Sequence, residues 1–488
     1  MMDATPLSEA KRKLLEKYYH GNSRVSSVPG DAIAPRTKGE MTPVSLSQEQ
    51  LVHRERQMQG GSPLYNECIR LKMKGPLDVL ILKKSLREII RRHEIWRSSY
   101  VLNGSQLMQV IHDVPEHVEL PVVDLRDATE SGADAEIQRV AGEAVRRHFD
   151  LQEGPLLRAR MFRTGDMEYS LFLAAHLSIV DGVSVYQVLP FELAALYRAY
   201  SCGQDSPLAD LTVQFGDYAH WHRQWLHGDD AAKQIAYWRK QLAGPIPVLN
   251  WPVGRARPAK ETFRGMIQSF TLRHELVETL GALSRQEGGT LFMGLLAGLV
   301  SLLHFYTQQD DIMVGTPSPA GRKRSEVQKL LGYFLNPVAL RFDLAGDPAF
   351  RTLLRQAQRV TLEALSNDDV PLEILAHELG ADIDRGRNPF FTAAMSLQPS
   401  VPELGLEWGV TSMDVDSGGS PWDLYLAFIN SATETIVRVQ YNPDLFEGAA
   451  ITRLIADYET VLNAVNNSPA ARMSQLRISP YLYDLASR

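Results

Sequence analysis

The sequence predicts a two-lobed α/β protein. Its 488 residues exceed what one hydrophobic core usually holds, so two lobes of ordinary domain size are expected. Hydrophobic residues make up 44% of the chain, which is enough to give each lobe a core. Strand-like and helix-like segments occur in similar numbers before and after residue 228, and this similarity indicates a pseudo-duplicated architecture.

Composition divides the chain into four parts. Residues 1–40 comprise a short charged helix, at 6–20, and a polar linker that is rich in Pro and Gly. Residues 41–227 form the N-terminal lobe, 228–470 the C-terminal lobe and 471–488 a C-terminal linker. The helix at 6–20 is either an inter-domain connection or a solvated surface helix, and the sequence favours neither.

The first long helix of the N-terminal lobe has a clear start signal. Asp78 is an expected N-cap, because a carboxylate there can accept hydrogen bonds from the first free backbone N–H groups. The apolar residues that follow it are spaced to form one buried face, which gives the helix a packing role. These residues are Val79, Leu82, Leu86, Ile89 and Ile90.

A hairpin is expected to deliver the chain to a lone histidine. After a second helix at 136–148, two strands meet at Gly165-Asp166, and the second strand, 169–175, runs directly into His176. The next segment, 183–200, has helical periodicity with a kink expected at Pro190. The C-terminal lobe repeats this mixture of helices, at 231–242, 291–306 and 449–466, and strands, at 264–272, 311–317 and 436–446.

Composition and charge exclude several classes of protein. The net charge is -7 and the basic residues are scattered, so a nucleic-acid partner is not expected. Residues 291–306 are shorter than the roughly 20 residues of a membrane span and carry Ser301 and His304, so we expect a buried core helix there and no membrane partner. The two cysteines, Cys68 and Cys202, have no zinc or disulfide spacing. A reducing, cytoplasmic setting fits them best.

Several short motifs occur in one order along the chain. They are VSLSQEQL (44–51), RRHEIWRSSY (91–100), VQFGDYAHWHRQWL (213–226), GYFLN (332–336), NDDVPLEIL (367–375), RGRNPFF (385–391), WDLYLAF (422–428) and YNPDLF (441–446). Together they resemble the motifs of condensation domains of nonribosomal peptide synthetases, in the chloramphenicol-acetyltransferase-like superfamily. Trp96 and Ser98 are modest departures from the family pattern.

The resemblance implies an architecture and a set of partners. It implies two chloramphenicol-acetyltransferase-like lobes that form a V-shaped pseudo-dimer around a central tunnel. Donor and acceptor carrier proteins would dock at opposite mouths of this tunnel and present their substrates on phosphopantetheine arms. Neighbouring synthetase or synthase domains would be further partners, and the chain itself would bind no cofactor.

The segment HLSIVDG, His176 to Gly182, resembles the family motif His-His-x-x-x-Asp-Gly with one change. When Asp181 and Gly182 are kept in register, Leu177 occupies the position of the family's catalytic second histidine. Neighbouring side chains on a strand point to opposite faces, so His176 is expected to point away from the tunnel unless a β-bulge redirects it. We therefore expect His176 to have a structural role.

Other motif residues receive supporting roles from the resemblance. Asp181 would pair with Arg97 and hold the loop, since a buried charge needs a partner. Gly182 would give the backbone room at the tunnel, although it could equally be a turn residue. Ser178 is a weak candidate for a catalytic hydroxyl, and Asn336 closes the GYFLN motif.

Three functions are consistent with these motifs. The first is condensation, in which a carrier-bound acyl or peptidyl thioester is transferred to an acceptor amine in a peptide or hybrid polyketide assembly line. The second is a catalytically degenerate scaffold, gatekeeper or recruitment platform for carrier-bound intermediates, which Leu177 favours. The third is a free-standing acyltransferase acting on an alcohol. Condensation is the primary assignment, because a single substitution is set against an otherwise matching chain.

Overall fold

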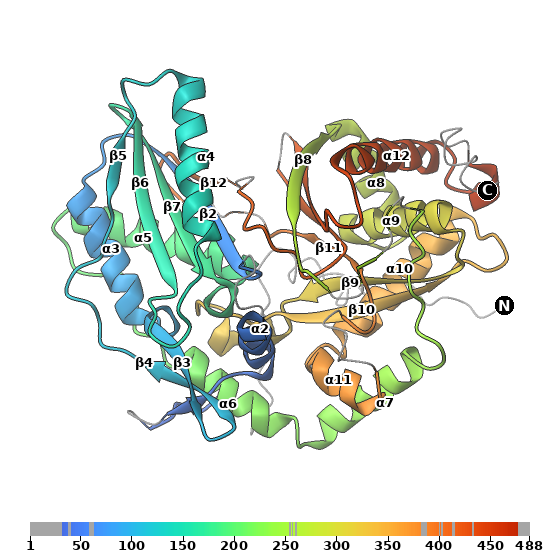
Figure 1. Ribbon diagram of the computed structural model, residues 1–488, viewed down its shortest axis with the longest axis horizontal. Coiled ribbons are helices and arrows are strands. Elements are labelled where there is room, and N and C mark those ends of the chain that lie inside the picture. The colour runs from blue at the N-terminus through green and yellow to red at the C-terminus, as the bar shows by residue number, and fades with distance from the viewer. Residues whose placement is uncertain are drawn as a thin grey trace.

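The computed structural model places two lobes side by side, each a twisted sheet with helices packed against it (Figure 1). The predicted helix at 6–20 and most of the predicted C-terminal linker lie outside the described residues. The structure describes residues 32–37, 41–57, 63–252, 255, 257–258, 261–381, 388–399, 401, 404–411, 415–431 and 434–476.

The N-terminal lobe is built on a five-stranded sheet in the order β12-β2-β7-β6-β5. A three-stranded sheet, β1-β4-β3, lies below it in the view of Figure 1. The strands are β1 (Thr42–Pro43), β2 (Asn66–Lys74), β3 (Ser98–Asn103), β4 (Gln106–Ile111), β5 (Val122–Asp124), β6 (Leu157–Gly165), β7 (Glu168–His176) and β12 (Trp408–Thr411). The helices are α2 (Leu46–Gln57), α3 (Val79–Arg92), α4 (Glu130–Arg146), α5 (Leu189–Ser201) and α6 (Phe215–Trp225), with the short helical turns η1 (Glu94–Arg97), η2 (Leu177–Ile179) and η3 (Ser184–Val188).

The C-terminal lobe is built on a six-stranded mixed sheet in the order β10-β9-β11-β13-β14-β8. Its strands are β8 (Met266–Leu272), β9 (Asp311–Ser318), β10 (Asn336–Asp343), β11 (Ala393–Leu397), β13 (Leu424–Asn430) and β14 (Thr435–Tyr441). Its helices are α7 (Asp229–Gln241), α8 (His274–Gln286), α9 (Leu291–Thr307), α10 (Phe350–Leu365), α11 (Leu372–Glu378) and α12 (Gly448–Asn467), with the turns η4 (Ala320–Lys323), η5 (Ser325–Val327) and η6 (Met473–Gln475).

Local sequence signals explain most of these elements. Asp78 caps α3 by accepting hydrogen bonds from the backbone N–H groups of Leu80, at 2.7 Å, and Ile81, at 3.2 Å. The predicted hairpin is β6 and β7, which pair antiparallel along their length. As expected, α9 is a core helix, buried from Phe292 to Leu303. These elements are confirmed in place and type.

Two helices differ from the prediction in detail. Helix α4 begins at Glu130, six residues before the expected start, because Thr129 caps it by accepting a hydrogen bond from the Gly132 N–H at 3.2 Å. Near Pro190 the chain stays helical, but it forms the π-helical segment η3 directly before α5. Proline has no N–H group, so the α-helical hydrogen-bond pattern is interrupted there.

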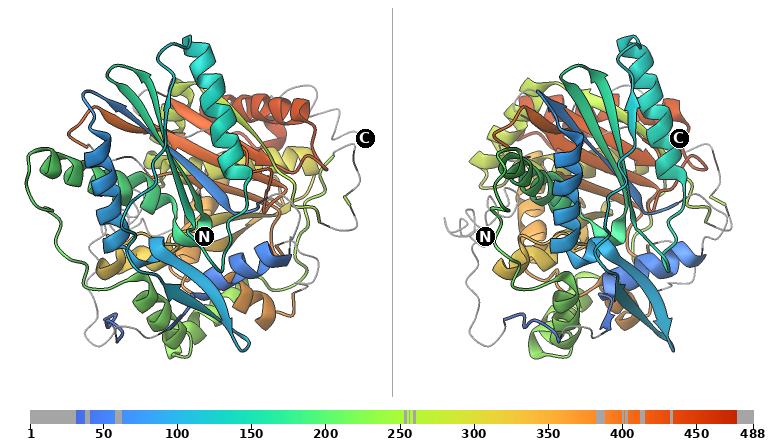
Figure 2. Two further views of the ribbon diagram at one scale, coloured as in Figure 1. Left: turned by 60° about the vertical axis from the view of Figure 1, so that its left-hand side comes forward. Right: turned by 90° about the vertical axis from the view of Figure 1, so that its left-hand side faces the viewer.

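The two lobes do not follow a single division of the sequence. Strand β12, although it comes late in the chain, pairs antiparallel with β2 at the edge of the N-terminal sheet (Figure 2). Side chains that follow β9 also pack into the N-terminal hydrophobic core, namely Val327, Leu330, Leu331 and Phe334. Later segments of the chain therefore complete the N-terminal lobe.

The described part of the chain contains no single helix that is both long and apolar enough to cross a bilayer. Only α8 and α9 taken together meet that test, and they are bent by 106° relative to each other.

Candidate functional site

The segment HLSIVDG lies where β7 ends and the chain turns toward the C-terminal lobe. The backbone N–H of His176 donates to the Leu156 carbonyl at 3.0 Å, and that of Leu177 donates to the Tyr65 carbonyl at 2.7 Å. The pairing with β2 therefore continues one residue beyond the strand. The side chains of His176 and Leu177 consequently point to opposite faces of the sheet.

His176 is enclosed within the N-terminal lobe and does not line the cavity between the lobes. Its Nδ1 lies 2.7 Å from the Ser178 hydroxyl, and its ring makes edge contacts with Tyr65 and Phe149. Complete burial without a charged partner lowers the pKa of His176 to about 3, so the imidazole is neutral near pH 7.

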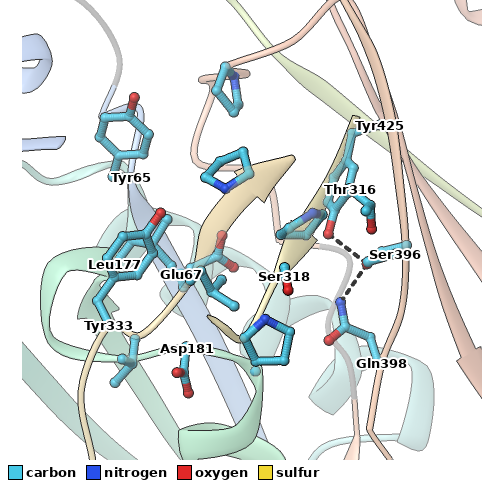
Figure 3. A pocket seen from close by; sticks show the side chains of 18 of the residues that line it. Tyr65, Glu67, Leu177, Asp181, Thr316, Ser318, Tyr333, Ser396, Gln398 and Tyr425 are labelled. Carbon is cyan, nitrogen blue, oxygen red and sulfur yellow. Dashed lines mark hydrogen bonds between the residues drawn. The ribbon is translucent and has the colours of Figure 1, made fainter. Parts of the chain in front are cut away.

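A cavity of about 240 Å³ lies between the two lobes. The N-terminal lobe lines it with side chains from α2, β2 and the HLSIVDG segment, and the C-terminal lobe with side chains from β9, β11, β13 and β14 (Figure 3). Leu177 and Gly182 both face it. Leu177 also packs against an apolar cluster formed by Leu51, Leu64, Tyr65 and Tyr333.

Asp181 forms a buried ion pair with an arginine of the other half of the chain. Its Oδ1 and Oδ2 accept hydrogen bonds from Nη2 and Nε of Arg322 at 2.8 and 2.9 Å. The Ser184 N–H donates to Oδ1 at 2.7 Å and the Phe334 N–H donates to Oδ2 at 3.2 Å. Asp181 thus fixes the loop after β7 to the segment that follows β9.

The expected partner of Asp181, Arg97, lies elsewhere, so that prediction was wrong. Arg97 sits on η1 and donates to the His112 carbonyl, with Glu94 3.8 Å away. The sequence offered several arginines, and spacing alone could not rank them. Arg322 sits 141 residues after Asp181, and only the packing of the two lobes brings the two together.

The Arg-His-Glu segment has its own set of buried partners. Arg92 and His93 both contact the carboxylate of Glu192 on α5, at 3.1 and 2.9 Å. His93 also accepts a hydrogen bond at 3.2 Å from the N–H of Leu331, in the segment after β9. Glu94 pairs with Arg36. These contacts hold α3, α5 and the segment after β9 together and do not reach the cavity.

Two of the remaining predicted site residues, Ser178 and Asn336, make hydrogen bonds within the fold. Ser178 is fully buried, and its carbonyl accepts a hydrogen bond from the Gln48 side chain at 2.8 Å. Asn336 donates from Nδ2 to the Asp368 and Val370 carbonyls at 2.6 and 2.7 Å. Neither of these two side chains lines the cavity. Gly182 does line it, and a Cβ added at Gly182 would lie 3.1 Å from Gln398 Oε1.

Several polar side chains line the cavity that the sequence alone did not single out. Tyr425 and Ser396 share a hydrogen bond of 2.7 Å, and Gln398 donates to the Ser396 hydroxyl at 3.2 Å (Figure 3). Burial raises the pKa of Tyr425 to about 12 and also raises the pKa of Glu67. The alternation of Tyr65, Glu67 and Ile69 along a strand was the sequence signal that could have placed Glu67 on the Leu177 face.

The described residues contain no group of three or more His, Cys, Asp or Glu side chains arranged to hold a metal ion. Cys68 and Cys202 are not joined to each other by a disulfide.

Comparison with known proteins identifies the family. The family model described as Condensation domain matches residues 38–481. One of the linear gramicidin synthase proteins of Brevibacillus parabrevis is 35% identical over 470 residues, which is 95% of this chain and 6% of that protein. This chain spans less than a tenth of each of three linear gramicidin synthase proteins that it matches.

Solved structures share the fold over nearly the whole chain. The X-domain from teicoplanin biosynthesis, solved in complex with OxyB, is 26% identical, with a TM-score of 0.77 over 93% of this chain and 99% of that one. The first condensation domain of the calcium-dependent antibiotic synthetase, with a substrate analogue, superposes with a TM-score of 0.78 at 19% identity, over 91% of this chain and 100% of that one. The expected two-lobed fold is confirmed, and the chain belongs to the condensation-domain family of nonribosomal peptide synthetases.

Proposed function

We propose that this domain transfers an acyl or peptidyl group from one carrier-bound thioester to the amine of a second carrier-bound substrate. Family membership and the synthetases among the relatives support this proposal. The donor and acceptor would reach the cavity between the lobes on phosphopantetheine arms, from carrier proteins docked on the two sides. The chain would act as one domain of a peptide or hybrid polyketide assembly line.

The observation that carries the proposal is the position of Leu177 and Gly182 on the wall of the interlobe cavity, with His176 behind them. The apolar side chain of Leu177 cannot exchange protons, so it contributes to the shape of the cavity and to the exclusion of water from it. Holding an amine and a thioester in line removes much of the entropic barrier, worth about 7 to 11 kcal/mol in favourable cases. A general base adds typically about 10²- to 10⁴-fold. Positioning can therefore sustain the reaction without a histidine at 177.

The proposal extends to the surroundings of the domain. Cys68 and Cys202 are not joined by a disulfide, which suits a reducing compartment, and we place the assembly line in the cytoplasm. The teicoplanin X-domain forms a complex with OxyB, so that relative binds a separate protein. A recruitment role of that kind is the competing hypothesis for this chain.

Intact-protein mass spectrometry tests the proposal. The donor- and acceptor-loaded carrier proteins of the same synthetase are mixed with the wild-type domain, with no domain, or with the variants Leu177→His and Leu177→Met. We expect the wild-type domain to raise product well above the no-domain background. Leu177→Met is the control, because it keeps an apolar side chain of similar size and should retain the wild-type rate.

Two other outcomes would contradict the proposal in different ways. Product formed only with Leu177→His would mean that the natural domain is silenced for condensation. Absence of product from every variant, together with binding of the loaded carriers, would favour a recruitment role.

A further inference from the structure

The cavity wall beside Leu177 carries a carboxylate, Glu67. Among the described residues that line the cavity, the other carboxylate is Asp181, and Arg322 occupies both of its oxygens. In the view of Figure 3 the carboxylate of Glu67 is seen between Leu177 and Ser318. Its position follows from the pairing of two strands.

The register of β2 and β7 places Glu67 on the Leu177 face of the sheet. Glu67 is directly opposite Ala175, and Asn66 is opposite His176. Residues opposite each other in an antiparallel pair share a face, and so do residues two apart along one strand. Glu67, Ala175 and Leu177 therefore share one face of the sheet, and Glu67 and Leu177 of these line the cavity. Diagonal neighbours of this kind lie about 7 to 8 Å apart.

Charged and titratable groups from several elements surround Glu67. Arg438 on β14, Tyr186 on η3 and Tyr425 on β13 interact with it electrostatically. Asp416 also interacts electrostatically with Arg438. Burial raises the pKa of Glu67 and Arg438 partly opposes this, so the carboxylate is a stronger base than an exposed glutamate.

Several other ionisable groups that line the cavity are poor proton acceptors. Burial raises the pKa of Tyr65 and also that of Tyr333, so both phenols stay protonated at neutral pH. Arg54 is a cation and donates to the Tyr65 hydroxyl at 3.4 Å. Asp181 is committed to Arg322. Among the described residues that line the cavity, Glu67 is therefore the carboxylate left to accept a proton from an incoming amine.

We propose that Glu67 is the proton acceptor of the condensation reaction and takes the place of a histidine at position 177. The amine nitrogen attacks the thioester carbonyl carbon, a C–N bond forms, and the nitrogen gives its proton to the Glu67 carboxylate. The C–S bond then breaks, the sulfur of the phosphopantetheine arm leaves as a thiolate, and Glu67 returns the proton to it. The products are an amide and a free thiol, so atoms and charge balance.

This inference rests on the proposed function, and single-turnover transfer between loaded carrier proteins tests both. Glu67→Gln should lower the transfer rate at pH 7.5 by about 10²-fold or more, the lower range for a general base. The wild-type rate divided by the Glu67→Gln rate should rise with pH through the pKa of Glu67 and then level off. Titration of the acceptor amine affects both proteins equally and cancels in this ratio.

Two further variants separate proton transfer from structure. Glu67→Asp keeps a carboxylate, so its transfer rate should be reduced but should still rise with pH. This variant provides the test if Glu67→Gln fails to fold. The double variant Leu177→His/Glu67→Gln supplies a base at the neighbouring position, so its transfer rate should be at least tenfold higher than that of Glu67→Gln. Thermal melting of each variant monitors the fold.

Glu373→Gln is the matched control. Glu373 is a second partly buried carboxylate, and desolvation raises its pKa to about 7, but it does not line the cavity. Loss of the pH limb in Glu373→Gln, or an unchanged rate in folded Glu67→Gln, would overturn the inference while wild-type transfer still supported the proposed function. Absence of transfer by the wild-type domain would contradict the proposed function, and the inference with it.

Discussion

Arg322 lies across Asp181 so that two of its guanidinium nitrogens each meet one carboxylate oxygen, at 2.9 and 2.8 Å. Both side chains are buried, and Arg322 also donates to the Leu330 carbonyl at 2.9 Å. The paired geometry satisfies charges that would be costly to bury alone. It links the loop beside the cavity to the segment that completes the N-terminal core.

Loss of this pair should destabilise the whole domain. Arg322→Met leaves Asp181 buried without its cation, which typically costs about 3 to 5 kcal/mol of unfolding free energy. Arg322→Lys should also be destabilising, because an ammonium cannot reproduce the two parallel hydrogen bonds. Urea unfolding measures both. Arg97→Met is the control, and a loss as large as that of Arg322→Met would contradict the assignment of Arg322 as the partner.

Substitution of Gly182 should impair transfer more than folding. A Cβ at this position would lie 3.1 Å from Gln398 Oε1 and 3.7 Å from Pro399 Cδ, and larger side chains would enter the cavity. Gly182→Leu should therefore abolish product formation, whereas Gly182→Ala combined with Gln398→Ala should regain activity relative to Gly182→Ala. The mass-spectrometric transfer assay measures each variant.

Gly409 provides the matched glycine control. A Cβ there would have open space around it, so Gly409→Ala should leave both the melting temperature and the transfer rate unchanged. Wild-type activity in Gly182→Leu would show that the cavity wall at Gly182 does not contact the substrates.

His176 should make stability depend on pH in mildly acidic solution. Its folded-state pKa of about 3 lies below the ordinary value of 6.5, so unfolding takes up a proton. The contribution of the neutral ring is fully present above about pH 6.5 and is lost as pH falls toward 3. Between pH 7.5 and pH 5, wild-type unfolding free energy should therefore fall by about 2 kcal/mol more than that of His176→Phe.

Urea unfolding at the two pH values makes this comparison. Glu373 shifts stability in the opposite direction, because its raised pKa favours the folded state as pH falls, but it is present in both proteins and cancels. Parallel pH profiles would contradict the assignment of a neutral, buried His176. His176→Phe should retain product formation, since the side chain does not face the cavity.

Asn336 should be needed for the stability of the fold. Its amide donates to two carbonyls of the 368–370 loop, and its Oδ1 accepts from the Leu372 N–H at 3.3 Å. Asn336→Ala leaves these buried groups unpaired, at a cost of about 1 to 3 kcal/mol for each unsatisfied group. Asn336→Asp should be worse, because a carboxylate would face two carbonyl oxygens. Chemical denaturation of the two variants tests this order.

Sequence patterns predicted the elements that are determined by interactions between residues close together in the chain. Asp78 and the apolar positions after it predicted α3, and Gly165-Asp166 predicted the hairpin of β6 and β7. Strand alternation predicted the direction of His176 from its neighbours alone. These features depend on contacts within a few residues of each other along the chain.

Features that depend on distant contacts were not predictable from one sequence. Arg322 has no local signal that distinguishes it from Arg97, and the four residues of β12 gain their strand conformation by pairing with β2, more than 300 positions earlier. Glu67 was overlooked because a carboxylate in an alternating strand is normally solvent-facing. Only the second lobe, packed over that face, encloses it.

The pairing of β12 with β2 also matters for recombination between related synthetases. A chimera made by replacing residues 41–227 alone would set a foreign β2 against the resident β12, and foreign core side chains against the resident Val327 and Phe334. Backbone hydrogen bonds tolerate such an exchange better than close-packed side chains do. A subdomain graft that respects the packing comprises three segments: residues 41–227, the stretch after β9 that holds Arg322, and β12.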